Sequence, residues 1–108
     1  MTTARQDKMR QYLRELSADF FNREAGPHSL ITVTDVTISP DLKRATIFIT
    51  TIPSSEEARA LEFAKRKRTD LREYIGSKTR LRALPVFEVK LDEGERARQR
   101  IDDIINQG

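Results

Sequence analysis

The chain has 108 residues, of which 34% are charged and 37% hydrophobic, and its net charge is +3. This length suits one domain with a modest core, so we expect residues 1–108 to form a single domain. There is no cysteine, which excludes disulfides, thiolate metal sites and cysteine nucleophiles. No apolar run approaches the roughly 20 residues that cross a bilayer, and the first ten residues lack the apolar core of a signal peptide. We therefore expect a cytoplasmic protein with no membrane partner.

An amphipathic helix is predicted over about residues 5–24. Its apolar residues recur at steps of three and four and form one stripe, which comprises Met9, Tyr12, Leu13, Leu16, Phe20 and Phe21. The stretch AGPH at 25–28 should end the helix, because Gly26 suits a C-terminal cap and Pro27 cannot continue the helical hydrogen bonds.

Two segments rich in β-branched residues, 30–38 and 44–52, are predicted strands joined by the turn SPDLK. In the first segment the apolar alternation changes side near Asp35, which indicates a β-bulge or a strand that is covered on both faces. In the second, Ala45, Ile47 and Ile49 share one side. The pattern predicts an antiparallel hairpin.

Ser54 and Glu57 have the capping-box spacing, so a helix should begin there. Thr69 and Asp70 suit helix N-termini better than helix interiors, so we predict a kink between helices of about 55–67 and 70–79. The sparse buried side of this helix pair is expected to comprise Ala58, Leu61, Ala64, Leu71, Tyr74 and Ile75. The kink itself is assigned to Lys67, Arg68, Thr69 and Asp70.

The last predicted elements are a strand over 84–91 and a short helix over about 94–106. In the strand Phe87, Val89 and Leu91 should face inward, whereas Glu88 and Lys90 should face outward. A hairpin and a later strand, with helices over one face, make a two-layer α+β sandwich.

Positive charge is concentrated in residues 64–82, which hold eight basic residues and only two acids. Such a segment is either a solvated helix face or a surface that binds phosphates without reading bases. We predict the second, and the candidate RNA-binding residues are Lys65, Arg66, Lys67, Arg68, Arg72, Lys78, Arg80 and Arg82. The helix lacks the large apolar face of a membrane-binding helix. The chain has only two tyrosines and five phenylalanines, several of them expected in the core, so base stacking should not be the main source of affinity.

The sequence contains few residues or motifs that indicate catalysis. His28 is the sole histidine and follows Gly-Pro in a loop, and no phosphate-binding loop or metalloprotease motif is present. Asp41 is best explained by turn chemistry and Asp35 by local capping or bridging. A metal-dependent nuclease that uses Asp35 or Asp41 is kept as a minor alternative. We expect no enzyme activity, no cofactor, no metal and no small-molecule substrate.

Three stretches resemble the ribosome-binding factor A family in collinear order: LITVTDVTISPDLKRATIFIT, LREYIGSKTRLRALPVFEV and ARQRIDDII. The resemblance implies a type II K-homology (KH)-like domain with the order α-β-β-α-kink-α-β, followed here by the short C-terminal helix. It implies a non-enzymatic assembly factor, often associated with cold adaptation, that binds the small (30S) ribosomal subunit and assists 16S rRNA maturation. The implied partners are the small subunit and 16S rRNA, and the chain is expected to be a monomer.

The sequence departs from the family at the kink. Where the family has Ala-x-Gly, this chain has Lys67, Arg68 and Thr69. The alternative to RNA binding is a protein-interaction module whose basic surface meets an acidic protein.

Overall fold

The computed structural model describes residues 4–24, 30–52, 54–81 and 83–94, and the statements below concern these residues. The elements follow the predicted order: α1 (Ala4–Glu24), β1 (Leu30–Ile38), β2 (Arg44–Ile52), a 3₁₀ turn η1 (Ser54–Glu56), α2 (Glu57–Arg66), α3 (Arg68–Lys78) and β3 (Val86–Leu91). Four predictions lie outside the described residues, namely the helix stop at 25–28, His28, the candidate RNA-binding residue Arg82 and most of the C-terminal helix over 94–106. No helix among the described residues is long and apolar enough to cross a membrane.

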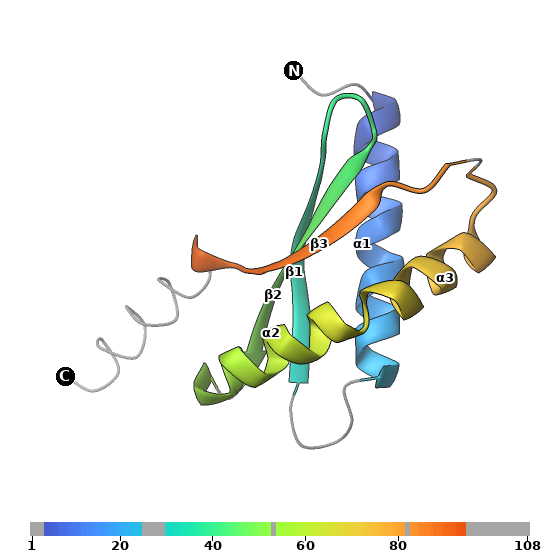
Figure 1. Cartoon of the computed structure of the whole chain (residues 1–108). Helices are drawn as coiled ribbons and strands as arrows, with labels where there is room; N and C mark the ends of the chain where they lie inside the picture. Colours follow the sequence, from blue (N-terminus) through green and yellow to red (C-terminus); the bar gives the residue numbers. More distant parts are fainter. Residues whose placement is uncertain (1–3, 25–29, 53, 82, 95–108) are drawn as a thin grey trace.

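The three strands form one sheet in the order β1-β2-β3. β1 and β2 pair antiparallel, as expected for a hairpin, whereas β2 and β3 pair in parallel. A parallel pair cannot be joined by a tight turn, so the chain must cross from one end of the sheet to the other between them. α2 and α3 provide that crossover, which leads from the end of β2 back to the start of β3 (Figure 1).

A β-bulge in β1 explains its change of alternation. Val33 pairs with Ile49 and Asp35 with Phe48, which leaves Thr34 as an extra residue. The bulge puts Val36 on the buried side together with Val33. The Thr34 hydroxyl donates its single proton to the Asp92 carboxylate just after β3, and its oxygen also lies 3.3 Å from the Phe48 carbonyl oxygen. The predicted bulge is confirmed, and its extra residue links the two edges of the sheet.

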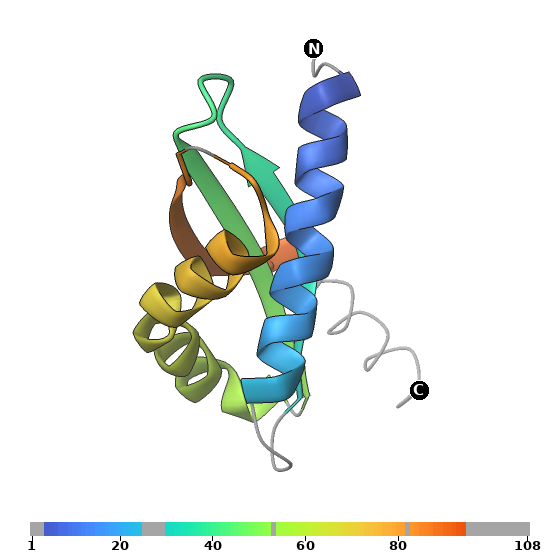
Figure 2. The ribbon, with the colours of Figure 1, turned by 90° about the vertical axis from the view of Figure 1, so that its right-hand side faces the viewer.

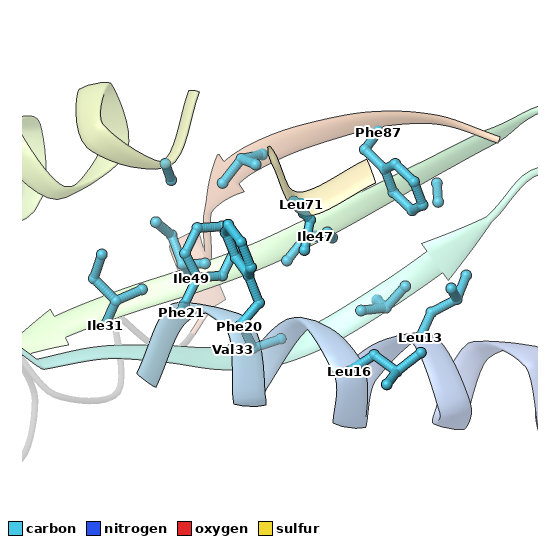
Figure 3. Close-up of a cluster of buried hydrophobic side chains, with 14 of the residues drawn as sticks. Leu13, Leu16, Phe20, Phe21, Ile31, Val33, Ile47, Ile49, Leu71 and Phe87 are labelled. Atoms are coloured by element: carbon cyan, nitrogen blue, oxygen red, sulfur yellow. The ribbon is translucent and has the colours of Figure 1, made fainter. Parts of the chain in front are cut away.

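The hydrophobic core lies between the sheet and the helices. α1 contributes Phe20 and Phe21, whose rings meet edge to face at a centroid distance of 5.2 Å. α3 contributes Leu71 and Ile75 to the same cluster (Figure 3). Alternate residues of β2 face this core, so the helices cover a single face of the sheet, as the turned view shows (Figure 2). The two-layer α+β prediction is confirmed.

α2 differs in detail from its prediction. It begins at Glu57, after η1, and its N-cap is Glu56, whose side chain makes no capping hydrogen bond. Its buried residues are Ala60 and Ala64, whereas Ala58, which was expected inside, is exposed. Two alanines four residues apart form a smooth stripe, which lets the helix approach β2 and β3 closely.

The turn between β1 and β2 is built by Ser39 and Asp41. The Asp41 carboxylate accepts hydrogen bonds from the Ser39 hydroxyl (2.6 Å) and the Lys43 N–H (3.0 Å). The Ser39 hydroxyl oxygen in turn accepts from the Arg44 N–H at 3.0 Å. The two hydrogen bonds to the carboxylate lower the pKa of Asp41 below its ordinary value of 3.8, and the bond from the Ser39 hydroxyl contributes most. Asp41 is therefore a turn residue, as predicted.

Candidate nucleic-acid interface

The bend between α2 and α3 is centred on Lys67. This residue has φ −90° and ψ 5°, and its N–H donates to the Phe63 carbonyl at 3.0 Å and the Ala64 carbonyl at 3.2 Å. The Leu71 N–H donates to the Lys67 carbonyl at 2.8 Å. Lys67 thus keeps a helical hydrogen bond on each side of the bend, while the axes of α2 and α3 diverge (Figure 2).

Part of the kink prediction is wrong. Thr69 and Asp70 do not cap a new helix, because α3 begins at Arg68 and both residues lie in its first turn. The N-cap position of α3 is Lys67, and it carries no side-chain capping bond. The negative φ of Lys67 is accessible to any residue with a side chain, so this bend does not require a glycine. That explains how the chain bends here without a glycine.

The Lys67 side chain is turned toward the protein. Its ammonium lies 3.7 Å from the Glu24 carboxylate at the end of α1 and 3.6 Å from the Asp70 carboxylate, and its side chain is only 32% exposed. It also lies 5.8 Å from the centre of the Phe63 ring. Lys67 therefore joins the bend to α1. Its ammonium is paired with carboxylates of the protein, which is true of no other predicted RNA-binding residue that the structure describes.

Four cations near the bend face solvent. We call Lys65, Arg66, Arg68 and Arg72 the bend cations; all four are exposed. None of them takes part in the ion pairs found within the described segments. Unpaired, exposed cations are free to contact phosphates without first giving up a protein partner.

A small hollow, the bend hollow, lies beside two of these cations. Its volume is about 280 Å³, and its lining residues come from the start of α3 and the start of β3: Arg68, Thr69, Arg72, Val86 and Phe87. Arg68 and Arg72 are one helical turn apart and share a face of α3. Val86 is 61% exposed, so an apolar surface adjoins the two guanidinium groups. A nucleotide could place its phosphate on the arginines and its sugar against Val86.

Lys78 and Arg80 lie away from the bend, at the far end of α3. They line a second hollow of about 580 Å³ together with Arg5, Lys8 and Tyr12 of α1, and we call it the α1–α3 hollow. The predicted basic residues are thus divided between two places. Arg82 lies outside the described residues.

Residues of α1 were missing from the predicted site. Tyr12 was placed in the buried stripe, but it is 45% exposed, and its hydroxyl donates to the Lys78 carbonyl oxygen at 2.9 Å. Arg5, Lys8 and Tyr12 follow one another at steps of three and four, which puts them on one face of the helix. That spacing could have revealed the basic edge of the apolar stripe. Val86 gave no such signal, because only the parallel pairing of β3 brings it beside α3.

The two carboxylates considered for catalysis have local roles. Asp35 accepts a hydrogen bond from the Val36 N–H at 2.8 Å, and Asp41 holds the turn described above. Within the described segments, no three His, Cys, Asp or Glu side chains gather in a way that could hold a metal ion. The roles that the structure shows for Asp35 and Asp41 thus lie within the hairpin.

The fold, with its antiparallel hairpin, bent helix pair and parallel third strand, is that of a KH-like α+β domain. The comparisons with known proteins agree with this class. A family model described as ribosome-binding factor A matches residues 5–105. The chain belongs to the ribosome-binding factor A family.

Individual relatives carry the same description. The chain is 38% identical over 76 residues to ribosome-binding factor A of Paramagnetospirillum magneticum, a match that covers 70% of this chain and 54% of that protein. It is 30% identical over 95 residues to the protein of Opitutus terrae, covering 87% and 78%. The chain thus spans little more than half the length of the first relative.

Solved structures share the fold. The crystal structure of ribosome-binding factor A from Thermus thermophilus matches with a TM-score of 0.71 at 23% identity, over 80% of this chain and 94% of that one. A homology model of the factor from the same species, fitted into a cryo-electron microscopy map of its complex with 30S, has a TM-score of 0.67 at 24% identity and covers 75% and 88%. Both likenesses concern the fold of the KH-like domain.

Proposed function

We propose that this chain binds the small ribosomal subunit during its assembly and assists the maturation of 16S rRNA as a cytoplasmic, non-enzymatic monomer. Membership of the family supports this proposal, as does the 30S complex of a protein with the same fold. The observation that carries it is the group of bend cations, which are exposed and have no acidic partner among the described residues. Ribosomal RNA offers the matching phosphates.

The mode of binding follows from the side chains present. Arginine can hold two phosphate oxygens at once through its planar guanidinium, whereas lysine acts as a mobile point charge. The bend cations comprise three arginines and one lysine and project from a helix pair anchored in the core by Leu71 and Ala64. A rigid support that carries phosphate-binding groups fixes the orientation of the RNA but does not read its sequence. Recognition should therefore depend on the shape of the rRNA.

The test is co-sedimentation of the purified chain with immature small subunits. The variant Lys65→Glu/Arg66→Glu/Arg68→Glu/Arg72→Glu should no longer co-sediment. The matched control reverses four exposed cations that line neither hollow: Arg10→Glu/Arg14→Glu/Lys43→Glu/Lys90→Glu. Both variants lower the net charge by the same amount, so they differ only in where the four reversed charges lie on the surface. Equal binding by the two variants would contradict the proposed site.

The alternative partner is an acidic protein. Val86 favours it, because an exposed apolar residue beside two arginines also suits a protein contact. Binding to isolated 16S rRNA fragments and to ribosomal proteins, measured separately, distinguishes the two. A steep salt dependence with rRNA supports the proposed function, whereas binding to an acidic protein alone supports the alternative.

A further inference from the structure

The α1–α3 hollow has the size of a ligand site. It lies between the first half of α1 and the segment that follows α3, and its volume is about 580 Å³. Small-molecule sites in proteins range from about 300 to 1,000 Å³. The hollow is separate from the bend hollow, with which it shares no lining residue.

The charged residues among the described lining of this hollow all have one sign. Arg5 and Lys8 lie on the α1 side, and Lys78 and Arg80 on the opposite side. No acidic residue is found among its described lining residues, and none of the four cations forms an ion pair within the described part of the chain. Lys78 also lies 5.7 Å from the centre of the Tyr74 ring. Four cations with no carboxylate between them attract an anion.

Tyr12 adds an aromatic surface to this charge. The residue is 45% exposed, and its hydroxyl donates to the Lys78 carbonyl oxygen on the opposite side at 2.9 Å. The hydrogen bond restrains the ring, so a ligand that stacks on it meets a surface already in place. Met9, Leu13 and Leu81 complete the apolar part of the lining. Cations beside a restrained ring match a nucleotide, in which a ribose joins the phosphate to the base.

We propose that the α1–α3 hollow binds one unpaired nucleotide of an RNA strand, with its base stacked on Tyr12 and its phosphates bound by Arg5, Lys8, Lys78 and Arg80. This inference rests on the proposed function, since it assigns a second contact to an RNA-binding protein. An unpaired base can leave the stack and offer its face, whereas a base within a helix cannot. The bend cations then bind RNA by shape, and the α1–α3 hollow selects a single-stranded position.

The chain provides its own spectroscopic probe. It contains two tyrosines, Tyr12 and Tyr74, so Tyr74→Phe leaves Tyr12 as the only tyrosine while keeping an aromatic ring at position 74. In this variant the Tyr12 ring proton resonances, followed by NMR, should shift upfield when a six-nucleotide single-stranded adenosine RNA is added. The same strand in a duplex should cause no such shift. Absence of an upfield shift at a saturating concentration of the single strand would overturn the inference.

Affinity supplies an independent test, measured by fluorescence anisotropy of the same labelled hexanucleotide. Loss of base stacking on an aromatic ring weakens binding roughly 5- to 150-fold, which is expected for Tyr12→Leu. Tyr12→Phe keeps the ring but loses the hydrogen bond to the Lys78 carbonyl oxygen, so it should bind more tightly than Tyr12→Leu and no more tightly than the unmodified chain. Circular dichroism establishes that each variant is folded. Equal affinities of folded Tyr12→Leu and Tyr12→Phe would overturn the stacking contact.

Two further measurements complete the test. One distinguishes a free nucleotide from a nucleotide of an RNA strand, and the other distinguishes failure of this inference from failure of the proposed function. If adenosine monophosphate binds as tightly as the hexanucleotide, the hollow holds a free nucleotide and the assignment to an RNA strand is wrong. If the chain co-sediments with small subunits but the hexanucleotide does not shift Tyr12, this inference fails while the proposed function stands. If the hexanucleotide shifts Tyr12 but co-sedimentation is absent, the hollow is supported and the proposed function fails.

Discussion

Lys67 at the bend and Glu24 at the end of α1 face each other, with 3.7 Å between the ammonium nitrogen and the carboxylate oxygen. A carboxylate at a helix C-terminus is unfavourable by itself, because the helix dipole is negative there. The Lys67 ammonium offsets that charge and ties the bend to a helix far away in the sequence. The Lys67–Glu24 pair thus adds a contact at the bend to the Tyr12–Lys78 hydrogen bond, which joins α1 to the far end of α3.

Lys67→Ala should lower stability slightly and leave RNA binding almost unchanged. The pair is partly exposed, so its contribution is expected to be within about 1 kcal/mol. Urea denaturation monitored by circular dichroism measures the change. Arg66→Ala serves as the control, because Arg66 makes no ion pair among the described residues and should affect binding but not stability. A large loss of rRNA binding in Lys67→Ala would show that Lys67 contacts RNA directly.

The salt dependence of rRNA binding should report the number of phosphate contacts. Arg68→Ala/Arg72→Ala removes two cations from the bend hollow. If each contacts one phosphate, the slope of log K against log salt should decrease in magnitude by about 1.4 to 1.8, depending on whether the strand is single or paired. Filter binding at several salt concentrations measures this slope. An unchanged slope would mean that neither arginine contacts a phosphate.

Val86→Asp should weaken rRNA binding without unfolding the chain. Val86 is 61% exposed and lies beside Arg68 and Arg72, so a carboxylate there would attract both guanidinium groups and repel phosphates. Val86→Thr keeps the β-branched shape without the charge and should bind normally. The melting temperatures of both variants should be close to that of the unmodified chain. Equal affinities of Val86→Asp and Val86→Thr for rRNA would indicate that the bend hollow is not part of the interface.

Ser39→Ala should raise the pKa of Asp41 toward its ordinary value of 3.8, because the Ser39 hydroxyl is the main cause of its lowering. An NMR titration of the Asp41 side chain tests this. In the unmodified chain the lowered pKa means that the ionised carboxylate stabilises the fold above its unfolded-state pKa. This stabilisation is lost as the pH falls through the folded-state value. A pKa that does not change in Ser39→Ala would contradict the assigned hydrogen bond.

The elements could be predicted because local patterns determine them. The alternation in β2 and the bulge in β1 follow from side chains that must face one core, and the structure confirms both. The buried side of α2 was harder to predict. Ala58, Ala60 and Ala64 have the same chemistry, and packing against β2 and β3 selects two of them.

The candidate site was only partly predictable. The sequence shows where positive charge is dense, but not which of the neighbouring cations is used internally. Lys67 pairs with Glu24 across a contact between α1 and the bend that no local pattern reveals. Tyr12 was placed in the core by its spacing alone, whereas its hydroxyl finds a partner at the surface. Tertiary contacts, rather than composition, divide the basic residues among these roles.

The parallel pairing of β2 with β3 also has a consequence for the order of folding. The hairpin joins neighbouring strands, but β3 can dock only after the intervening chain has closed a long loop, which costs entropy before it gains contacts. We therefore expect the hairpin to form early and β3 to dock last. Conservative core mutations should then give higher φ-values at Ile47 than at Val89, and the reverse order would refute this sequence of events. Both hollows depend on the segment from α3 to β3, so a chain that has just folded its hairpin cannot yet bind RNA through them.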